Sequence, residues 1–513
     1  MYVGNATKNI KGGNMKIIVQ AGGKGTRLEG LTHNKPKCLV PVHNKPMIFH
    51  LFEKYPSAEF IIIGDYKFDV LQCYLKTFAK HINYHLIRAQ GCGNICGIKE
   101  ALQYLSSNES FLLIWSDLIL SKNFHPENLP NGNYVGILEG VPCSWIFQEG
   151  KLEKITSNTH GVAGCFLFEN KEVLTNIATA GSFTSWLAHS KIPLRPMEMP
   201  NCLEVGTLLA ISKFQDNQNR CRPYNQMQFT QDKVIKTGLT AEGKKLIDRE
   251  VTWYQQMASY GFTAMPKIYS LNPLTMQRIN GINLFQAKLT MEEKEEVTQR
   301  LIEGVNQMHS YTTSPSNKED LIQEYYTKTI QRLHSIEEVI PFARQKYISI
   351  NGRMCKNPLL FIDDFKRAVE QKLLDTIFCP IHGDCTLTNT LLDTQYNIYF
   401  IDARGYFGSQ SVIGDIRYDW AKLYYSMIGN FDRFNIKDFT LDIGIDKIDF
   451  HITSNGWETA AALLLKNMKN CQESDIKFIH AIIWLSLASH CWEDYDSLCL
   501  AFYHGVYLLQ EHL

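Results

Sequence analysis

Short apolar runs alternate with longer stretches of helical character over residues 15–215 of the chain. The apolar runs have the length of buried strands, and the segments between them are long enough for helices. Strands that alternate with helices predict an α/β domain with a mostly parallel sheet and helices on both faces. We expect strands at Lys16–Gln20, Glu59–Gly64, Tyr84–Arg88 and Phe111–Trp115, and helices at Met47–Lys54, Phe68–Lys80 and Gly97–Leu105.

The pattern changes at a polar stretch, Gln215–Pro223, which we interpret as a linker. A β-rich part follows it, and after Leu284 the sequence predicts mainly helices, apart from a short β segment near residues 382–402. We therefore expect a leader at 1–14, one domain at 15–215 and a second domain at 222–513. In the β-rich part we expect a hairpin at Met227–Lys236, a long helix at Ala241–Tyr260, and strands at Lys267–Ser270 and Leu274–Arg278.

Composition narrows the class of protein. At 513 residues the chain is too long for one core, and its 52 basic residues equal its 52 acidic ones. That balance argues against a nucleic-acid partner, and no apolar run approaches the ~20 residues of a membrane span. Residues 1–14 lack the apolar stretch of a secretory signal and are either an alternative start or a disordered leader. The 14 cysteines are then reduced thiols, and we expect a cytoplasmic protein.

A glycine-rich loop directly follows the first expected strand. It reads Val19-Gln20-Ala21-Gly22-Gly23-Lys24-Gly25-Thr26-Arg27-Leu28, and Asn34-Lys35-Pro36-Lys37 comes after it. Glycines let the backbone approach a triphosphate that a Cβ would obstruct. Arg27 and Lys37 can neutralise charge on a transferring phosphoryl group. Ligands of parallel sheets bind at the carboxyl ends of strands, which is where this loop and Asp117 fall.

These residues resemble the nucleotidyltransferase family that makes nucleoside-diphosphate sugars and CDP-choline-type compounds. The resemblance implies that Lys37 contacts phosphate and that Asp117 and Glu204 bind Mg²⁺, although the family more often has Asp at the second position. It also implies that Gly93, in Gly93-Asn94-Ile95-Cys96-Gly97, lies in the segment that reads base and sugar. The nucleotide is then held by the loop residues Ala21, Gly22, Gly23, Gly25 and Thr26.

A second set of residues suited to phosphate chemistry lies near the end of the chain. His382-Gly383-Asp384 is followed by Asn389 and by Ile401-Asp402. Phosphoryl transfer to a hydroxyl needs a base-like carboxylate near the acceptor and side-chain oxygens that hold Mg²⁺ between phosphates. Asp384 can serve as the base, and Asn389 and Asp402 as the metal ligands.

This set resembles the aminoglycoside phosphotransferase and choline kinase superfamily. The resemblance implies a bilobal, protein-kinase-like α+β domain that uses ATP. Tyr418-Asp419-Trp420 is similar to the start of a helix that follows the motifs in that superfamily. Lys236 fits the strand lysine that clamps the phosphates of ATP, and Glu250 fits its ion-pair partner.

Together the two sets predict a bifunctional enzyme that phosphorylates a small alcohol or sugar with ATP and couples the product to an NTP, with CTP favoured. Such products usually feed surface polysaccharide or lipid decoration, an expectation carried by the resemblance.

The small substrate stays open between an amino alcohol such as choline and a sugar or polyol. A choline reader needs an aromatic or acidic cage, for which Trp420 and Trp492 are two of many candidates. Three alternatives remain. The first unit could transfer a uridylyl or guanylyl group to a sugar 1-phosphate, it could be a glycosyltransferase of related fold, or one half could be catalytically degenerate. The oligomeric state is not predicted.

Overall fold

The computed structural model describes residues 15–215 and 225–513, and the chain divides into two compact units. Of the described residues, the first unit holds 15–215 together with Trp492–Tyr495, and the second holds the rest. The expected leader and nearly all of the expected linker lie outside the described residues. Within the described ranges, no helix combines the length and the apolar character that crossing a bilayer requires.

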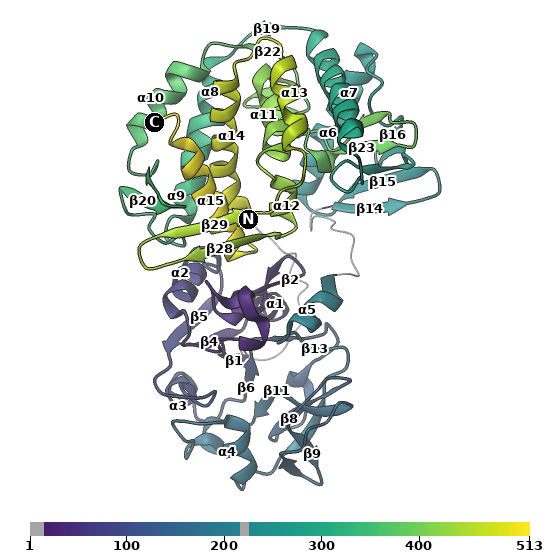
Figure 1. Cartoon of the computed structure of the whole chain (residues 1–513). Coiled ribbons are helices and arrows are strands. Elements are labelled where there is room, and N and C mark those ends of the chain that lie inside the picture. The colour runs from purple at the N-terminus through teal and green to yellow at the C-terminus, as the bar shows by residue number, and fades with distance from the viewer. Residues whose placement is uncertain (1–14, 216–224) are drawn as a thin grey trace. The chain divides into compact units, whose positions relative to one another are not determined.

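A 7-stranded sheet of order β12-β8-β11-β6-β1-β4-β5 forms the centre of the first unit (Figure 1). β1 (Lys16–Gln20) lies between β4 (Glu59–Gly64) and β6 (Phe111–Trp115) and pairs in parallel with both. β11 (His160–Phe168) is antiparallel to both of its neighbours, so it alone runs against the other strands. The expectation of a mostly parallel sheet is therefore confirmed.

The other elements of the first unit agree closely with the expected ones, with one shortened helix. The segment expected as a helix at Gly97–Leu105 is α-helical only in α3 (Ile98–Ala101) and continues as a 3₁₀ turn at Leu102–Tyr104. The polar residues that follow, beginning at Ser106, favour a turn and stop the helix early. The remaining elements are β2 (Pro41–Val42), β3 (Lys45–Pro46), α1 (Met47–Lys54), α2 (Phe68–Phe78), β5 (Asn83–Arg88), β7 (Leu118–Ile119), β8 (Tyr134–Glu139), β9 (Ile146–Gln148), β10 (Lys151–Glu153), α4 (Phe183–His189), β12 (Arg195–Glu198), β13 (Leu203–Glu204) and α5 (Leu208–Gln215).

Two groups of buried side chains hold the first unit together. The larger group comes from the central strands and includes Ile18, Ile61 and Leu113, all fully buried. The smaller group, here called the loop cluster, fixes the segments that leave the carboxyl ends of the strands. Its members are Leu28, Val40, Val42, Met47, Val205 and Ile211.

The second unit begins with a 4-stranded sheet of order β14-β15-β17-β16 beside a long helix (Figure 1). The helix, α6 (Ala241–Tyr260), has the bounds expected from the sequence. The Thr240 side chain accepts from the backbone N–H of Gly243 at its start, and Gly261 ends it with φ 81°. The strands are β14 (Asn225–Phe229), β15 (Lys233–Gly238), β16 (Ile268–Leu271) and β17 (Leu274–Gln277).

The rest of the second unit is mainly helical, as expected, with short strands around the predicted motifs. The helices are α7 (Met291–Ser310), α8 (Lys318–Ile322), α9 (Lys328–Ile336), α10 (Ile362–Leu373), α11 (Ile416–Met427), α12 (Phe431–Asn435), α13 (Glu458–Asn467), α14 (Glu473–Leu487) and α15 (Tyr495–Leu509). The short strands are β18 (Gly281–Asn283), β19 (Ser314–Pro315), β22 (Ile377–Pro380), β23 (Thr390–Asp393), β24 (Ile398–Phe400), β25 (Tyr406–Phe407), β26 (Gln410–Ser411) and β27 (Ile413–Asp415).

A further sheet of order β21-β20-β29-β28 was not expected in this helical part. β20 (Tyr347–Ile350) and β21 (Arg353–Lys356) form a hairpin whose turn holds Asn351 and Gly352, both with positive φ. An Asn-Gly pair between alternating runs is a strong hairpin signal, so this prediction of helix was wrong for a reason visible in the sequence. The partner strands are β28 (Phe439–Ile443) and β29 (Ile448–Ile452).

Candidate active sites

Four charged side chains predicted from the sequence meet in the first unit around Gly206. Lys37 Nζ forms an ion pair with Asp117 Oδ2, and Arg27 Nη2 lies 3.5 Å from Glu204 Oε1. A Cβ placed on Gly206 would lie 2.8 Å from Asp117 Oδ2, 3.1 Å from Lys37 Nζ and 3.2 Å from Arg27 Nη2. The glycine is therefore the floor on which these groups converge, and a side chain there would displace them.

Short-range pairing brings these groups together from distant parts of the chain. β7 follows Asp117 and pairs antiparallel with β13, which ends at Glu204. The Val205 N–H also donates to the Asp117 carbonyl at 2.9 Å. Beside the functional residues in sequence, Leu28, Cys38 and Val205 are fully buried. Apolar anchors of this kind fix the backbone, so each neighbouring charged side chain leaves it in a defined direction.

The charges of this site are unevenly compensated. Burial, and then repulsion from Asp117, raise the pKa of Glu204, while Arg27 and Lys37 lower it by less. The Asp117 side chain is only 7% exposed, whereas that of Arg27 is 61% exposed. Arg27 is thus free to move toward a ligand, while the two carboxylates are held close together.

These two carboxylates are suited to the Mg²⁺ that the family resemblance implies. They repel each other, as the raised pKa of Glu204 reflects, and a divalent cation would relieve that repulsion. Within the described ranges, no group of three or more His, Cys, Asp or Glu side chains could enclose a metal. One or two carboxylates completed by substrate phosphates is the arrangement that Mg²⁺ commonly adopts. Asp117 and Glu204 would therefore hold the ion.

The glycine-rich loop runs close to its neighbours at two of its glycines and into open space at a third. A Cβ on Gly22 would lie 2.9 Å from Asp65 Cβ, and Gly25 has φ 68° with Lys37 Cβ 3.0 Å from such a position. A Cβ on Gly23 would have nothing within 4 Å, so its bare backbone faces space that a phosphate can enter. Ala21 is buried and donates to the Ile63 carbonyl at 2.8 Å, and Thr26 is exposed.

Gln20 is a residue whose role the sequence reasoning missed. Its side-chain amide donates to the Asn94 carbonyl at 2.6 Å and to the Cys96 carbonyl at 3.1 Å. Gly93, with φ 100°, tolerates no side chain, because a Cβ would lie 2.1 Å from the Gly181 carbonyl oxygen. The segment predicted to read base and sugar is therefore tied to the end of β1. An amide at the end of an otherwise apolar strand was the available signal.

The candidate site of the second unit contains an ion-pair chain. Lys236 Nζ on β15 donates to Glu250 Oε2 on α6 at 2.6 Å and also to Asp402 Oδ1. Burial raises the pKa of Glu250 to about 7, with Lys236 opposing that shift and Asp402 adding to it. The pKa of Lys236 is raised, because the two carboxylates outweigh the effect of burial. The structure thus brings together three residues singled out in the sequence, two of which, Lys236 and Glu250, were expected to form an ion pair.

The loop that carries Asp384 is linked to the loop that carries Asp402 by backbone hydrogen bonds. Ile401 N–H donates to the Asn389 carbonyl at 3.0 Å, and Arg404 N–H donates to the His382 carbonyl at 2.9 Å. Asn389 Nδ2 donates to Asp384 Oδ2 at 2.9 Å. Asp402 has φ 58°, an unusual backbone conformation of the kind that clusters at functional sites.

Asp419 organises the loop that carries Asp384, a role that the sequence did not assign to it. Its carboxylate accepts from the backbone N–H of His382 at 2.9 Å and of Gly383 at 2.7 Å, and it lies 3.1 Å from His309 Nε2. Despite complete burial, these partners hold its pKa below the usual value. A buried carboxylate bonded in this way fixes the loop that presents Asp384. The Tyr418-Asp419-Trp420 motif was the feature of the sequence from which this role of Asp419 could have been inferred.

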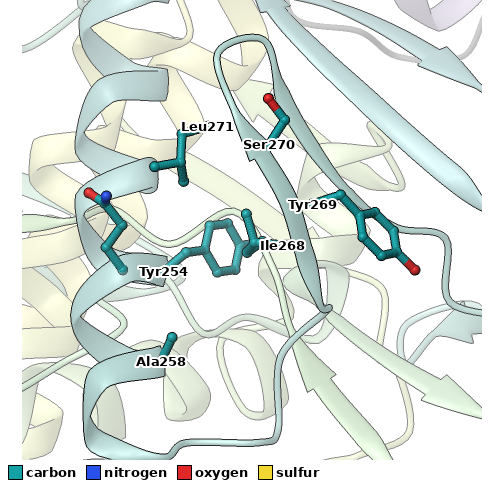
Figure 2. A pocket seen from close by; sticks show the side chains of 7 residues that line it. Tyr254, Ala258, Ile268, Tyr269, Ser270 and Leu271 are labelled. Atoms are coloured by element: carbon teal, nitrogen blue, oxygen red, sulfur yellow. The ribbon is translucent and has the colours of Figure 1, made fainter.

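A pocket of about 210 Å³ lies between α6 and the β16–β17 hairpin and contains none of the predicted site residues (Figure 2). In Figure 2, Tyr254 reaches from the helix toward Ile268, and Tyr269 points away from the helix. Tyr254 is one turn of α6 beyond Glu250. The pocket is therefore lined by the turn of α6 that follows Glu250.

Comparison with known proteins supports the predicted nucleotidyl transfer function of the first unit and does not test that of the second. Residues 16–127 match the family model described as nucleotidyl transferase. A mannose-1-phosphate guanyltransferase of Aspergillus fumigatus is 32% identical over 117 residues, which are 21% of this chain and 32% of that protein. A D-glycero-alpha-D-manno-heptose 1-phosphate guanylyltransferase of Campylobacter jejuni is 32% identical over 115 residues, 21% of this chain and 52% of that protein.

The chain thus spans between about a third and a half of the length of these curated relatives. The solved inositol-1-phosphate CTP transferase from T. maritima is 16% identical and covers 41% of this chain and 100% of its own, with a TM-score of 0.34. A score at that level supports no inference by itself. The family match and the curated relatives place a nucleotidyl transferase domain within the first ~130 residues of this chain.

Proposed function

We propose that the chain is a bifunctional enzyme that phosphorylates a small hydroxyl compound with ATP and then transfers a nucleotide from an NTP to the product. The observation that carries the first-unit activity is the convergence of Arg27, Lys37 and Asp117 on Gly206 within a matched nucleotidyl transferase region. In that step a phosphate oxygen of the acceptor bonds to the α-phosphorus of the NTP. The bond from that phosphorus to its bridging oxygen breaks, and pyrophosphate leaves.

The residues of the first unit suit this transfer through positioning and charge. Lys37 and Arg27 stabilise negative charge that builds up on the α-phosphate oxygens, and the glycine-rich loop lets the triphosphate approach the backbone. Asp117 and Glu204 would hold Mg²⁺, which would neutralise phosphate charge.

The second-unit activity is supported by the linkage of its two loops. Lys236, held by Glu250 and Asp402, is suited to clamp the phosphates of ATP, and Asp384 is suited to accept the proton of the acceptor hydroxyl. Asn389 and Asp402 would hold a Mg²⁺ ion, which would neutralise charge on the ATP phosphates. Because the motifs of the two units do not interleave along the chain, each activity depends on its own set of residues.

The two curated relatives described above suggest a second candidate for the nucleotide substrate. CTP is favoured by the sequence resemblance to CDP-choline-type enzymes, whereas both relatives described above are named for guanylyl transfer to a sugar 1-phosphate. GTP with a sugar 1-phosphate is therefore the second candidate. Surface polysaccharide or lipid decoration is the proposed destination of either product.

A coupled assay tests the two activities. The purified chain is incubated with Mg²⁺ and each of CTP, GTP, UTP and ATP, and pyrophosphate release is measured with a panel of phosphorylated alcohols and sugar 1-phosphates. ADP formation with the parent alcohols and sugars is measured separately. Lys37→Ala should let the phosphorylated intermediate accumulate. A kinase product that the first unit does not accept would contradict the sequential scheme.

A further inference from the structure

Four basic side chains gather beside Asp384 in the second unit, and we name Lys328, Arg332, Arg404 and Lys422 the basic cluster. Lys328 Nζ and Arg404 Nη2 bind the same atom, Glu324 Oε2, the latter at 2.7 Å. Lys422 Nζ lies 2.8 Å from Asp384 Oδ1. All four cations are half-buried, so they line a surface that solvent still reaches.

The basic cluster contains more positive than negative charge. Among the described residues, Glu324 and Asp384 are the carboxylates that form ion pairs with it. Arg332 Nη1 donates instead to neutral groups, the Ser486 hydroxyl at 2.6 Å and its carbonyl at 3.4 Å. The four basic side chains therefore face two carboxylates.

Neighbouring groups do not remove this excess. Asp320, the carboxylate four residues before Glu324, accepts hydrogen bonds from Ser409 and Gln410 rather than from the cluster. A further cation, Arg249, lies with its guanidinium carbon 3.8 Å from the centre of the Tyr406 ring, and Arg404 lies 4.2 Å from the same centre. The surroundings of the cluster are thus also positive.

The local electrostatic potential reflects this excess. Burial, followed by repulsion from Arg404, Arg332 and Lys422, holds the pKa of Lys328 well below its usual range. Burial would raise the pKa of Tyr406, but the nearby arginines lower it overall, in line with a field that favours negative charge. A bound anion would relieve the repulsion among the cations.

The basic cluster adjoins the proposed base and not the proposed ATP clamp. A Cβ on Gly383 would lie 2.9 Å from Arg404 Cβ, so Arg404 packs directly against the loop that carries Asp384. Lys422 contacts the Asp384 carboxylate itself. Lys236, by contrast, has its own acidic partners in Glu250 and Asp402. The cluster therefore lies where the acceptor must approach.

We propose that the basic cluster binds a carboxylate or phosphate group of the acceptor, so that the second unit phosphorylates an anionic hydroxyl compound and not an amino alcohol. This inference rests on the proposed kinase function. The acceptor hydroxyl oxygen bonds to the γ-phosphorus of ATP, the bond from that phosphorus to the β–γ bridging oxygen breaks, and the hydroxyl proton passes to Asp384 as ADP leaves. Arginine forks match the geometry of both anionic groups. Trp420, a candidate for a choline cage, is fully buried, so its ring is not presented to solvent.

A charge series of three-carbon acceptors tests this inference on the full chain with Mg²⁺ and ATP. The series is glycerol (neutral), serinol (cationic), D-glycerate (carboxylate) and glycerol 3-phosphate (phosphate). We measure kcat/KM for ADP formation, and binding of each compound by isothermal titration. D-glycerate or glycerol 3-phosphate should exceed glycerol and serinol by at least tenfold in kcat/KM or in affinity, and the better of the two identifies the anionic group.

Arg332→Gln separates a specific anion site from general attraction, because it removes one cation without touching Asp384. It should lower the preference for the anion over glycerol by roughly ten- to a hundredfold. Arg300→Gln is the matched control, since Arg300 lies on α7 and pairs with Glu296 on the exposed surface. It should leave that preference unchanged.

Two outcomes overturn the inference: serinol or glycerol equal to or better than both anions, or no binding of either anion. Phosphorylation of serinol alone would contradict the proposal of an anionic acceptor but would support the kinase function. Anion binding that depends on Arg332, without any ADP formation, would contradict the kinase function and leave the anion site standing.

Discussion

The two candidate sites use charge in opposite ways. In the first unit Arg27 is largely exposed, Asp117 and Glu204 repel each other, and a glycine forms the floor. In the second unit the functional groups are already paired, Lys236 with Glu250 and Asp402, and Asp384 with Lys422. The first site leaves one of its two ion pairs, Arg27–Glu204, long and partly exposed, whereas the second holds Lys236 in a short, buried pair with Glu250. Substitutions should therefore act on the first site through ligand contact and on the second through the internal network.

The largest expected effects come from removing one carboxylate in each unit. Asp117→Asn should lower nucleotidyl transfer, and Asp384→Asn should lower phosphorylation, each by roughly 10²- to 10⁴-fold, because a metal ligand or a base is lost. Each variant should keep the activity of the other unit, measured by pyrophosphate release and by ADP formation with the appropriate substrate. Circular dichroism provides the control for folding. A folded variant that has lost both activities would show that the sites are not independent.

Gly206→Ala tests whether the floor of the first site has to be bare. Its Cβ would come within 2.8 Å of Asp117 Oδ2 and must push flexible side-chain ends aside, so the fold should persist while the functional groups move. Misplacement of about 1 Å costs on the order of a hundredfold in rate, which we expect in kcat for nucleotidyl transfer. Gly30→Ala is the matched control, because a Cβ there meets nothing within 4 Å. Equal rates for the two variants would refute the role of Gly206.

Much of this arrangement could be predicted from local sequence. The strand and helix bounds around β1, α1, β4 and α6 follow from apolar runs, caps and glycine ends, all of which are local signals. Convergence on Gly206 could not be predicted in this way, since it depends on the β7–β13 pairing between distant segments. The basic cluster was missed for the same reason, because Lys328, Arg404 and Lys422 are ordinary charges until the fold assembles them.

Gln20→Leu should weaken the recognition of the nucleotide. The change removes both hydrogen bonds that tie the segment of Asn94 and Cys96 to β1, at about 1 kcal/mol each. We expect KM for the preferred NTP to rise by roughly tenfold or more, with a smaller change in kcat, because the reacting groups at Gly206 are untouched. Steady-state kinetics with CTP and GTP measure both constants. A drop confined to kcat would mean that Gln20 acts on the transfer step instead.

Acid should impair the second unit through Glu250. Because burial raises its pKa from the usual 4.5 to about 7, this carboxyl gains a proton as pH falls through about 7. Lys236 then loses a negative partner and its fixed position, so kcat/KM for ATP should rise with pH and level off above about 8. If only the ionised form is active, the fall between pH 8 and pH 6 is roughly tenfold.

The comparison between the sites makes this last prediction specific. Glu204 in the first unit also has a raised pKa, so nucleotidyl transfer should weaken in acid as well, but through a group that pairs with the exposed Arg27. Glu250→Gln should lower phosphorylation at pH 8 and remove the inflection near pH 7, while the pH profile of nucleotidyl transfer stays as it was. If the inflection persists in Glu250→Gln, another group titrates there, and the preorganised ion pair does not set the pH dependence of the second site.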